Sequence, residues 1–236
     1  MSMESTGTRR MTHFDSDTAL IETMRLEPGH HLPLWPYHIK RLQTSAQVLG
    51  FALNLATLEQ QLHTYCVSLD ARQTWRIRLL LHRNGVITLE SGVLPPTATP
   101  VTCVATETAV PSNALWLRHK TTYRPLYDAA NRWLAQHPEV FDVIFLNEHE
   151  HVCEGSRSTV YIQDPDHARL WLTPPLSCGV LPGVQRQFLI DQGLVREAQI
   201  TRYDLACAPQ LRLSNALRGW LDTHWNQNTT AILDRI

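Results

Sequence analysis

The stretch His119-Lys120-Thr121-Thr122-Tyr123-Arg124 and, further on, Cys153-Glu154-Gly155-Ser156-Arg157-Ser158 are the most informative parts of the sequence. A lysine amine can hold an aldehyde cofactor as a Schiff base and then move a substrate proton. A buried carboxylate can keep the ring nitrogen of such a cofactor protonated, so that the ring accepts electrons. Lys120 and Glu154 therefore suggest a pyridoxal phosphate site, although a lysine or glutamate by itself is more often a solvated surface charge.

The residues that precede this pair predict a small α+β unit. Pro36 suits the first turn of a helix, Gly50 suits its end, and apolar residues between them recur at helical spacing. Alternating apolar residues from Trp75 to Leu81, followed by the turn Asn84-Gly85, predict a β-hairpin that returns over residues 86–89. The other predicted elements are strands over residues 14–25 and 31–35 and helices over residues 36–49 and 55–66.

A proline-rich segment separates this unit from the rest of the chain. Pro95, Pro96 and Pro100 exclude a helix there. We expect a small N-terminal domain over residues 1–92, an interdomain linker over residues 93–100 and a larger cofactor-binding domain over residues 101–236. The second domain is predicted to contain strands over residues 101–106, 141–147, 159–163 and 169–172, and helices over residues 124–136 and 184–192. Strands interleaved with helices in both parts favour an α+β fold with a site between the domains.

Seven segments resemble, in chain order, those of one enzyme family. They are Leu20-Ile21-Glu22-Thr23-Met24-Arg25, His38-Ile39-Lys40-Arg41-Leu42, His119-Lys120-Thr121-Thr122, Glu154-Gly155-Ser156-Arg157-Ser158, Thr173-Pro174-Pro175-Leu176, Gly179-Val180-Leu181-Pro182-Gly183-Val184-Gln185-Arg186 and Leu213-Ser214-Asn215-Ala216-Leu217-Arg218-Gly219. From Leu20 onward the chain thus resembles the fold-type IV pyridoxal phosphate enzymes, which include branched-chain and D-amino acid aminotransferases and aminodeoxychorismate lyase. It is most similar to the lyase members, particularly the lyase domain fused to aminodeoxychorismate synthase.

The resemblance implies a fold, a cofactor and an activity. The fold is the two-domain α+β arrangement of D-amino acid aminotransferase, with pyridoxal phosphate between the domains, in a homodimer. The activity is that of 4-amino-4-deoxychorismate lyase, which gives 4-aminobenzoate and pyruvate for folate biosynthesis. A class IV aminotransferase for D- or branched-chain amino acids is the alternative, and a non-catalytic pyridoxal phosphate-binding protein is a second alternative.

Residue roles also follow from the resemblance. It makes Lys120 the covalent attachment point and the catalytic acid and base, and it pairs Glu154 with the ring nitrogen. Tyr123 stands where relatives commonly have Asn. This tyrosine either contacts the phenolic oxygen of the cofactor or packs in the core.

The phosphate group needs a cation and oriented amides. The resemblance assigns this role to Arg41, whose fixed fork of donors suits a dianion. Gly183, Val184 and Gln185 open a predicted helix, and free N–H groups at a helix start bind phosphate. Many relatives have Thr in place of Gln185, so a hydroxyl contact is in question, whereas the amide contacts do not depend on that side chain.

Substrate contacts are expected in two places. By analogy, Ser214 and Asn215 face the substrate carboxylate, although a Ser-Asn pair is equally an ordinary turn. Arg76 and Arg78 share one face of a strand. The two either reach a substrate carboxylate at the domain interface or form an exposed basic strand face, which is the plainer explanation.

Composition excludes several classes of protein. The 236 residues include 21 Lys and Arg against 22 Asp and Glu, so the net charge of −1 does not favour binding to nucleic acid or to anionic lipid. Five cysteines without a Cys-x-x-Cys pair argue against a disulfide framework or zinc site and favour a reducing cytoplasm. No apolar run is long enough to span a membrane. The histidines of His30-His31 and His149-Glu150-His151 lack further ligands, so we predict no metal site.

Overall fold

The computed structural model describes residue 15 and residues 17–233. Phe14 and Ser16, which belong to the first predicted strand, lie outside the described residues, as do the other residues of the range 1–14. Residues 234–236, at the end of the predicted second domain, also lie outside them.

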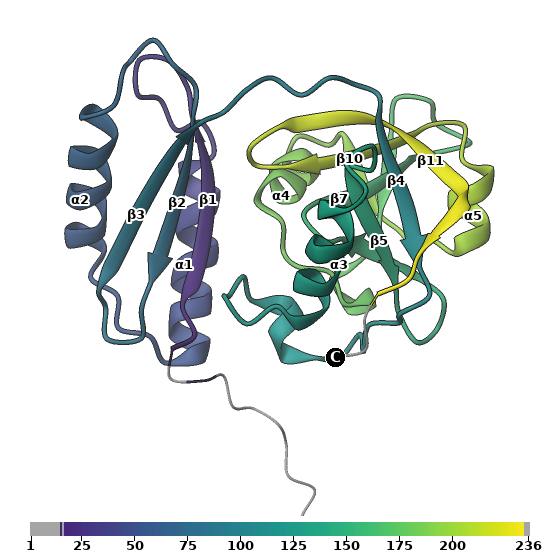
Figure 1. Cartoon of the computed structure of the whole chain (residues 1–236), viewed down its shortest axis with the longest axis horizontal. Coiled ribbons are helices and arrows are strands. Elements are labelled where there is room, and N and C mark those ends of the chain that lie inside the picture. Colours follow the sequence, from purple (N-terminus) through teal and green to yellow (C-terminus); the bar gives the residue numbers. More distant parts are fainter. Residues whose placement is uncertain (1–14, 16, 234–236) are drawn as a thin grey trace, which may run out of the picture.

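The first part of the chain packs two helices against a small antiparallel sheet (Figure 1). Within the described residues, this sheet has three strands in the order β1-β2-β3. Its core contains the fully buried Leu58 of the second helix and Ile77, Leu79 and Leu81 of the central strand. The elements are β1 (Leu20–Leu26), α1 (Trp35–Leu49), α2 (Leu55–Val67), β2 (Trp75–Leu81) and β3 (Ile87–Val93).

The local signals in this part explain where its elements begin and end. α1 has proline in its first turn, and Gly50 ends it in the left-handed conformation with φ 71°, donating its N–H to the carbonyl of Ala46. The predictions of both helices and of the hairpin are confirmed. The predicted strand over residues 31–35 is wrong. Gly29 and His30 both have positive φ, so the chain turns sharply, forms one bridge between Glu27 and His31, and enters α1 at Trp35.

The second part contains a larger mixed sheet. Among the described residues it has eight strands in the order β6-β5-β4-β11-β10-β7-β8-β9, and β4 lies between parallel neighbours β5 and β11. The strands are β4 (Val101–Thr106), β5 (Asp142–Leu146), β6 (Val152–Gly155), β7 (Thr159–Gln163), β8 (Trp171–Thr173), β9 (Val195–Glu197), β10 (Leu211–Asn215) and β11 (Gly219–Ala231). The helices are α3 (Pro125–Ala135), α4 (Val184–Asp191) and α5 (Arg202–Cys207), with short 3-10 turns at Leu115–Arg118 and Leu176–Cys178.

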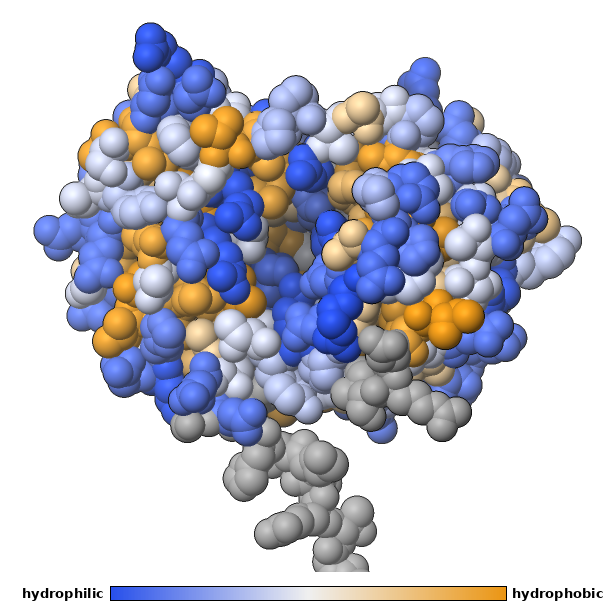
Figure 2. Space-filling model, in the orientation of Figure 1, coloured by the Kyte–Doolittle hydropathy of each residue, from blue (hydrophilic) through white to orange (hydrophobic). Residues whose placement is uncertain are grey.

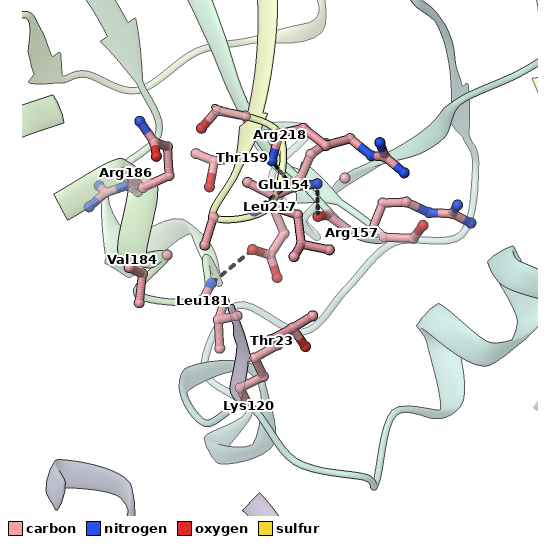
Figure 3. Close-up of a pocket in the computed structure, with 18 of the residues that line it drawn as sticks. Thr23, Lys120, Glu154, Arg157, Thr159, Leu181, Val184, Arg186, Leu217 and Arg218 are labelled. Atoms are coloured by element: carbon pink, nitrogen blue, oxygen red, sulfur yellow. Dashed lines mark hydrogen bonds between the residues drawn. The ribbon is translucent and has the colours of Figure 1, made fainter. Parts of the chain in front are cut away.

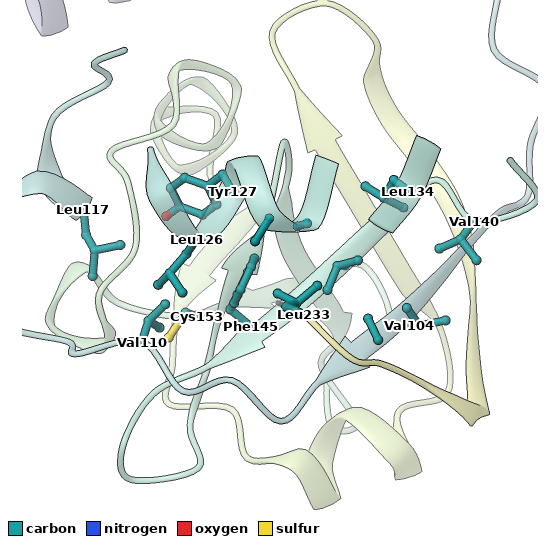
Figure 4. Close-up of a cluster of buried hydrophobic side chains, with 14 residues drawn as sticks. Val104, Val110, Leu117, Leu126, Tyr127, Leu134, Val140, Phe145, Cys153 and Leu233 are labelled. Atoms are coloured by element: carbon teal, nitrogen blue, oxygen red, sulfur yellow. The ribbon is translucent and has the colours of Figure 1, made fainter. Parts of the chain in front are cut away.

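Both faces of this sheet are covered, so β5 is buried along its whole length. Val143 and Phe145 join the cluster beneath α3, where they pack with Tyr127 and Ala130 (Figure 4). Ile144 faces the other cluster, which lies on the opposite side of the strand. Covering on both sides explains why this strand reads as a continuous apolar run in the sequence.

The predicted strands and helices of the second part are present. The short β6, β9 and α5, and the hairpin of β10 and β11, were not predicted from the sequence. The segment after β3 reaches β4 without helix or strand. We keep the domain boundary at residues 93–100 as a proposal, supported by the separate sheets on its two sides. None of the helices in the described part of the chain is both long and apolar enough to cross a membrane.

A buried aspartate holds the turn that follows β6. Asp142, at the start of β5, accepts hydrogen bonds from the hydroxyls of Ser156 (2.6 Å) and Ser158 (2.5 Å) and from the N–H of Val143 (2.8 Å). Gly155 passes directly over this carboxylate. A Cβ at Gly155 would lie 2.2 Å from the Asp142 Oδ2 atom, so only glycine fits without displacing the turn.

We predict that Gly155→Ala lowers the free energy of unfolding by about 1–3 kcal/mol, because the added methyl group overpacks the turn. Gly92→Ala is the matched control, since the nearest atom to a Cβ there is 3.8 Å away. Chemical denaturation of the two variants and the wild type measures the difference. Equal free energies of unfolding for the two variants would show that the turn accommodates a Cβ at residue 155 without loss of stability.

Candidate active site

A cavity of about 350 Å³ lies between the two parts of the molecule. Figure 2 shows a hollow there, bordered largely by hydrophilic residues. Both parts contribute to its wall. The lining side chains come from Thr23, Arg41 and Arg76 in the first part, and from Lys120, Arg124, Phe141, residues 154–159, Leu181, residues 183–186 and residues 214–218 in the second.

β1 fixes the backbone of Lys120. The carbonyl of Lys120 accepts a hydrogen bond from the N–H of Ile21 (2.8 Å), and the N–H of Thr122 donates to the carbonyl of Ala19 (2.9 Å). Among the described residues, no hydrogen bond or ion pair involves the Lys120 amine, which faces the cavity. Burial, reinforced by the positive charges of Arg124 and Arg41, holds the pKa of Lys120 well below its ordinary value. This amine can therefore accept and release a proton closer to neutral pH than a surface lysine can.

Glu154 enters the cavity from the end of β6. One of its oxygens accepts a hydrogen bond from the hydroxyl of Tyr127 (2.5 Å), and the other accepts one from the N–H of Leu181 (3.1 Å; Figure 3). Burial raises the pKa of Glu154 to about 7, against these hydrogen bonds and the nearby Arg124 and Lys120, which lower it. The carboxylate has hydrogen-bond donors but forms no ion pair within 4 Å with any described residue. It is therefore suited to a cationic group in the cavity.

Arg41 extends from α1 toward both parts of the molecule. Its guanidinium donates to the two oxygens of Glu22 (2.9 and 2.5 Å) and to the carbonyl of Pro182 (3.1 Å). The ring of His38 is 2.6 Å from the same carboxylate. Burial alone raises the pKa of Glu22, but Arg41 and His38 outweigh it and the pKa falls to about 2. Glu22 therefore stays charged and holds Arg41 in one orientation, with the remaining donors of the guanidinium free for another anion.

The start of α4 forms the wall beside Arg41. Gly183 precedes the helix, and within the described chain no side chain caps this end. The first N–H groups of a helix have no partner inside it, so they attract anions. A Cβ at Gly183 would lie 2.9 Å from the Thr159 hydroxyl oxygen, so glycine keeps this end of the cavity open.

Most residues that the sequence singles out meet in this one cavity, namely Arg41, Lys120, Glu154, Gly183, Val184, Gln185, Ser214 and Asn215. Tyr123 lies beside it, in a smaller cavity that Lys120 also lines, with its ring edge-on to Trp116 at 6.5 Å. Arg78 is not part of the lining and donates to Glu90 (3.2 Å), whereas Arg76 does line the cavity. The chemical roles of these residues stay predictions.

Sequence reasoning missed three residues that position the site. Tyr127 reads as part of an apolar helix face, but its hydroxyl holds Glu154. Asp142 reads as a polar start to a strand, yet it organises the turn after β6. Glu22 lies on the same buried face of β1 as Leu20, Met24 and Leu26. A carboxylate at every-second-residue spacing with apolar residues was the available signal that it has a cationic partner.

The raised pKa of Glu154 generates a prediction for protein freed of cofactor. Because the folded-state pKa of about 7 exceeds the ordinary value of 4.5, folding favours the protonated carboxyl. The protein then loses stability, on the order of 3 kcal/mol, as pH rises from 4.5 toward 7. Glu154→Gln removes this loss. Urea unfolding of both proteins across that range measures the difference, and parallel pH curves would refute the prediction.

Comparison with known proteins places this site in a family. The model of the amino-transferase class IV family matches residues 19–224, which is most of the chain. A protein of Schizosaccharomyces pombe described as "Putative aminodeoxychorismate lyase" is 26% identical over 196 residues, which cover 78% of this chain and 80% of that protein.

Solved structures with the same fold also bear aminotransferase names. A "Putative amino-acid aminotransferase" from Mesorhizobium loti is 34% identical with a TM-score of 0.81, covering 89% of this chain and all (100%) of that one. A hypothetical aminotransferase from Mycobacterium tuberculosis in a PLP-bound form, 20% identical with a TM-score of 0.73 over 92% of this chain and 87% of that one, shares the fold. The fold, the cavity and these matches lead to one conclusion: the chain belongs to the class IV aminotransferase family of pyridoxal phosphate-dependent enzymes.

Proposed function

We propose that this enzyme is a 4-amino-4-deoxychorismate lyase, which forms 4-aminobenzoate and pyruvate in folate biosynthesis. The observation that carries the proposal is the desolvated Lys120 amine, which lies in an arginine-rich cavity with Glu154. Each product has one carboxylate, so the substrate has two, and a cationic cavity suits it. The S. pombe relative and a Saccharomyces cerevisiae relative, 30% identical over 80 residues, are both described as aminodeoxychorismate lyases.

The residues present fit pyridoxal phosphate. Lys120 would hold its aldehyde carbon, and Arg41 with the amides at the start of α4 would hold its phosphate. Glu154 would pair with its ring nitrogen. The orientation of Arg41 by Glu22 and the open space at Gly183 both suit a phosphate at this end. When bound, the cofactor supplies a ring that withdraws electrons from the carbon attached to the substrate amine.

In this proposal Lys120 moves the proton. Its lowered pKa makes the free amine available to remove the proton from the amine-bearing carbon. The bond between the ring carbon and the enolpyruvyl oxygen then breaks, and the ring becomes aromatic. Lys120 returns the proton to the methylene carbon of enolpyruvate, which gives pyruvate. Atoms and charge balance without an oxidant or a second substrate.

An aminotransferase is the second candidate. The M. loti structure, at 34% identity over nearly the whole chain, bears an aminotransferase name. Both reactions use the same proton transfer by Lys120. They differ in whether the amino group leaves with the product or remains on the cofactor, and residues of the substrate end decide this.

The direct test combines an assay with mapping of the attachment site. We expect purified enzyme to release 4-aminobenzoate from aminodeoxychorismate, and borohydride reduction followed by peptide mass spectrometry to place the cofactor on Lys120. Lys120→Ala should give neither result. Lys40→Ala is the control, because Lys40 lies on the exposed side of α1. Transfer of amino groups to 2-oxoglutarate or pyruvate, without release of 4-aminobenzoate, would replace the lyase with an aminotransferase.

A second prediction concerns the phosphate anchor. Arg41→Ala should weaken cofactor binding roughly ten- to a hundredfold, and excess cofactor should restore much of the rate. It also leaves the buried charge of Glu22 with His38 but without its guanidinium partner, which costs up to about 3–5 kcal/mol of stability.

The double variant Arg41→Ala with Glu22→Gln separates the two effects. It should regain part of the lost stability, but the affinity for pyridoxal phosphate should stay low. Thermal unfolding and cofactor titration by absorbance measure these quantities. Wild-type cofactor affinity in either variant would remove Arg41 from the phosphate site.

We also propose that the enzyme forms a homodimer in a reducing cytoplasm. All five cysteines are free thiols, and four of them are buried, which suits a reducing compartment. Light scattering coupled to gel filtration tests the dimer.

A further inference from the structure

Six arginines line the cavity, and they differ in what they contact. Arg41 and Arg186 form ion pairs with Glu22 and Glu197. Arg124 donates to the carbonyl of Ser156 and lies over the ring of Tyr127. The other three, Arg76, Arg157 and Arg218, form no ion pair with any described residue.

Two of these three arginines lie at one end of the cavity. In Figure 3, Arg157 and Arg218 lie side by side on one side of Glu154, and Val184 and Arg186 lie on the other. The first pair therefore lies away from the helix start that suits the phosphate. Both arginines also line a second, open hollow, whose wall includes Pro95, Pro96 and Pro100 of the interdomain segment. This end of the cavity therefore reaches solvent.

Neutral groups hold the two arginines in place. The guanidinium of Arg157 donates to Asn131 (2.9 Å), and that of Arg218 donates to the Thr97 hydroxyl. Asn215 fixes both backbones, because its amide donates to the Arg157 carbonyl (3.3 Å) and its oxygen accepts the Arg218 N–H (3.0 Å). The side chains are thus oriented, but neither guanidinium forms an ion pair with a described residue.

Two adjacent like charges carry an electrostatic cost. Burial and the charge of Arg157 lower the pKa of Arg218. The buried Asp142 interacts electrostatically with Arg157, but its oxygens are committed to the hydroxyls of Ser156 and Ser158 and to backbone N–H groups. An anion placed between the arginines would relieve the repulsion and use the donors that remain on each guanidinium.

We propose that Arg157 and Arg218 bind a substrate carboxylate that is remote from the reacting amine. They make the enzyme specific for amino compounds that carry a carboxylate at the far end of the molecule. The inference rests on the proposed function in one respect: the lyase substrate and its product 4-aminobenzoate both have such a group. The amine then lies near Lys120 while the carboxylate points to the arginine pair.

The test measures binding to holoenzyme by calorimetry, with 4-aminobenzoate and its neutral isostere 4-aminobenzamide as probes. Wild type should bind the carboxylate roughly ten- to a hundredfold more tightly than the amide. Arg157→Gln and Arg218→Gln should each remove most of this preference, and Arg218→Lys should keep part of it. Arg72→Gln is the control, because Arg72 is 87% exposed and pairs with Asp70. In lyase assays the two glutamine variants should raise KM more than they lower kcat.

The ratio of the two affinities is taken within each protein, so a loss of stability does not imitate the expected result. Equal affinities for the two probes in the wild type would overturn the inference, whatever reaction the enzyme performs. Glutamine variants that keep the preference for the carboxylate would also overturn the inference, but they would not count against the proposed lyase function. A preference that needs both arginines, in an enzyme that makes no 4-aminobenzoate, would sustain the anion site and refute the lyase.

Discussion

The site depends on the buried ion pair between Glu22 and Arg41. Glu22 lies on β1 and Arg41 on α1, and the same guanidinium reaches the carbonyl of Pro182 in the other part of the molecule. β1 also holds the backbone of Lys120, through the hydrogen bond from Ile21. One strand therefore positions both the lysine and the arginine. Removing the charge of Glu22 would loosen Arg41 and leave the backbone hydrogen bond to Lys120 in place. It would also remove a negative charge that raises the pKa of Lys120 against the larger effects of burial and of Arg124 and Arg41.

Two buried glutamates show how surroundings decide the chemistry of one residue type. Glu22 has Arg41 and His38 as partners, and its pKa falls to about 2. Glu154 has only hydrogen-bond donors in contact, and burial raises its pKa to about 7. The first carboxylate is neutralised within the protein, so it serves as a fixed support. The second has no cation in direct contact among the described residues, so a protonated ring nitrogen placed against it would lower its pKa and be held by the charge.

How far the sequence predicts this molecule depends on the range of each signal. Helical spacing with Pro36 and Gly50, and the alternation around the turn Asn84-Gly85, are local, so α1 and the first hairpin are predictable. β10 and β11 join Leu213 to Leu221, but most residues of β11 are polar, and β6 has only four residues, so these strands lack a clear pattern. The resemblance of seven segments to one enzyme family identified most of the residues that line the cavity. The roles of Tyr127 and Asp142 were not predicted, because their hydrogen-bond partners lie 27 and 14–16 residues away in the sequence and only the fold brings them into contact.

The distribution of charge is another property that the sequence alone does not predict. A net charge of −1 predicts no general attraction to polyanions, but it hides an uneven distribution of charge. Six arginines line one cavity, and Glu154 is the only acidic residue lining it within the described chain. Such a concentration of positive charge is tolerated because Glu22 and Glu197 neutralise two of the arginines from behind the wall. Arginine charge without an ion pair remains at Arg157 and Arg218, whereas the end beside α4 offers the N–H groups of the helix start and the unused donors of Arg41. A ligand with a phosphate at one end and a carboxylate at the other would complete the balance, and this is the shape of a cofactor joined to its substrate.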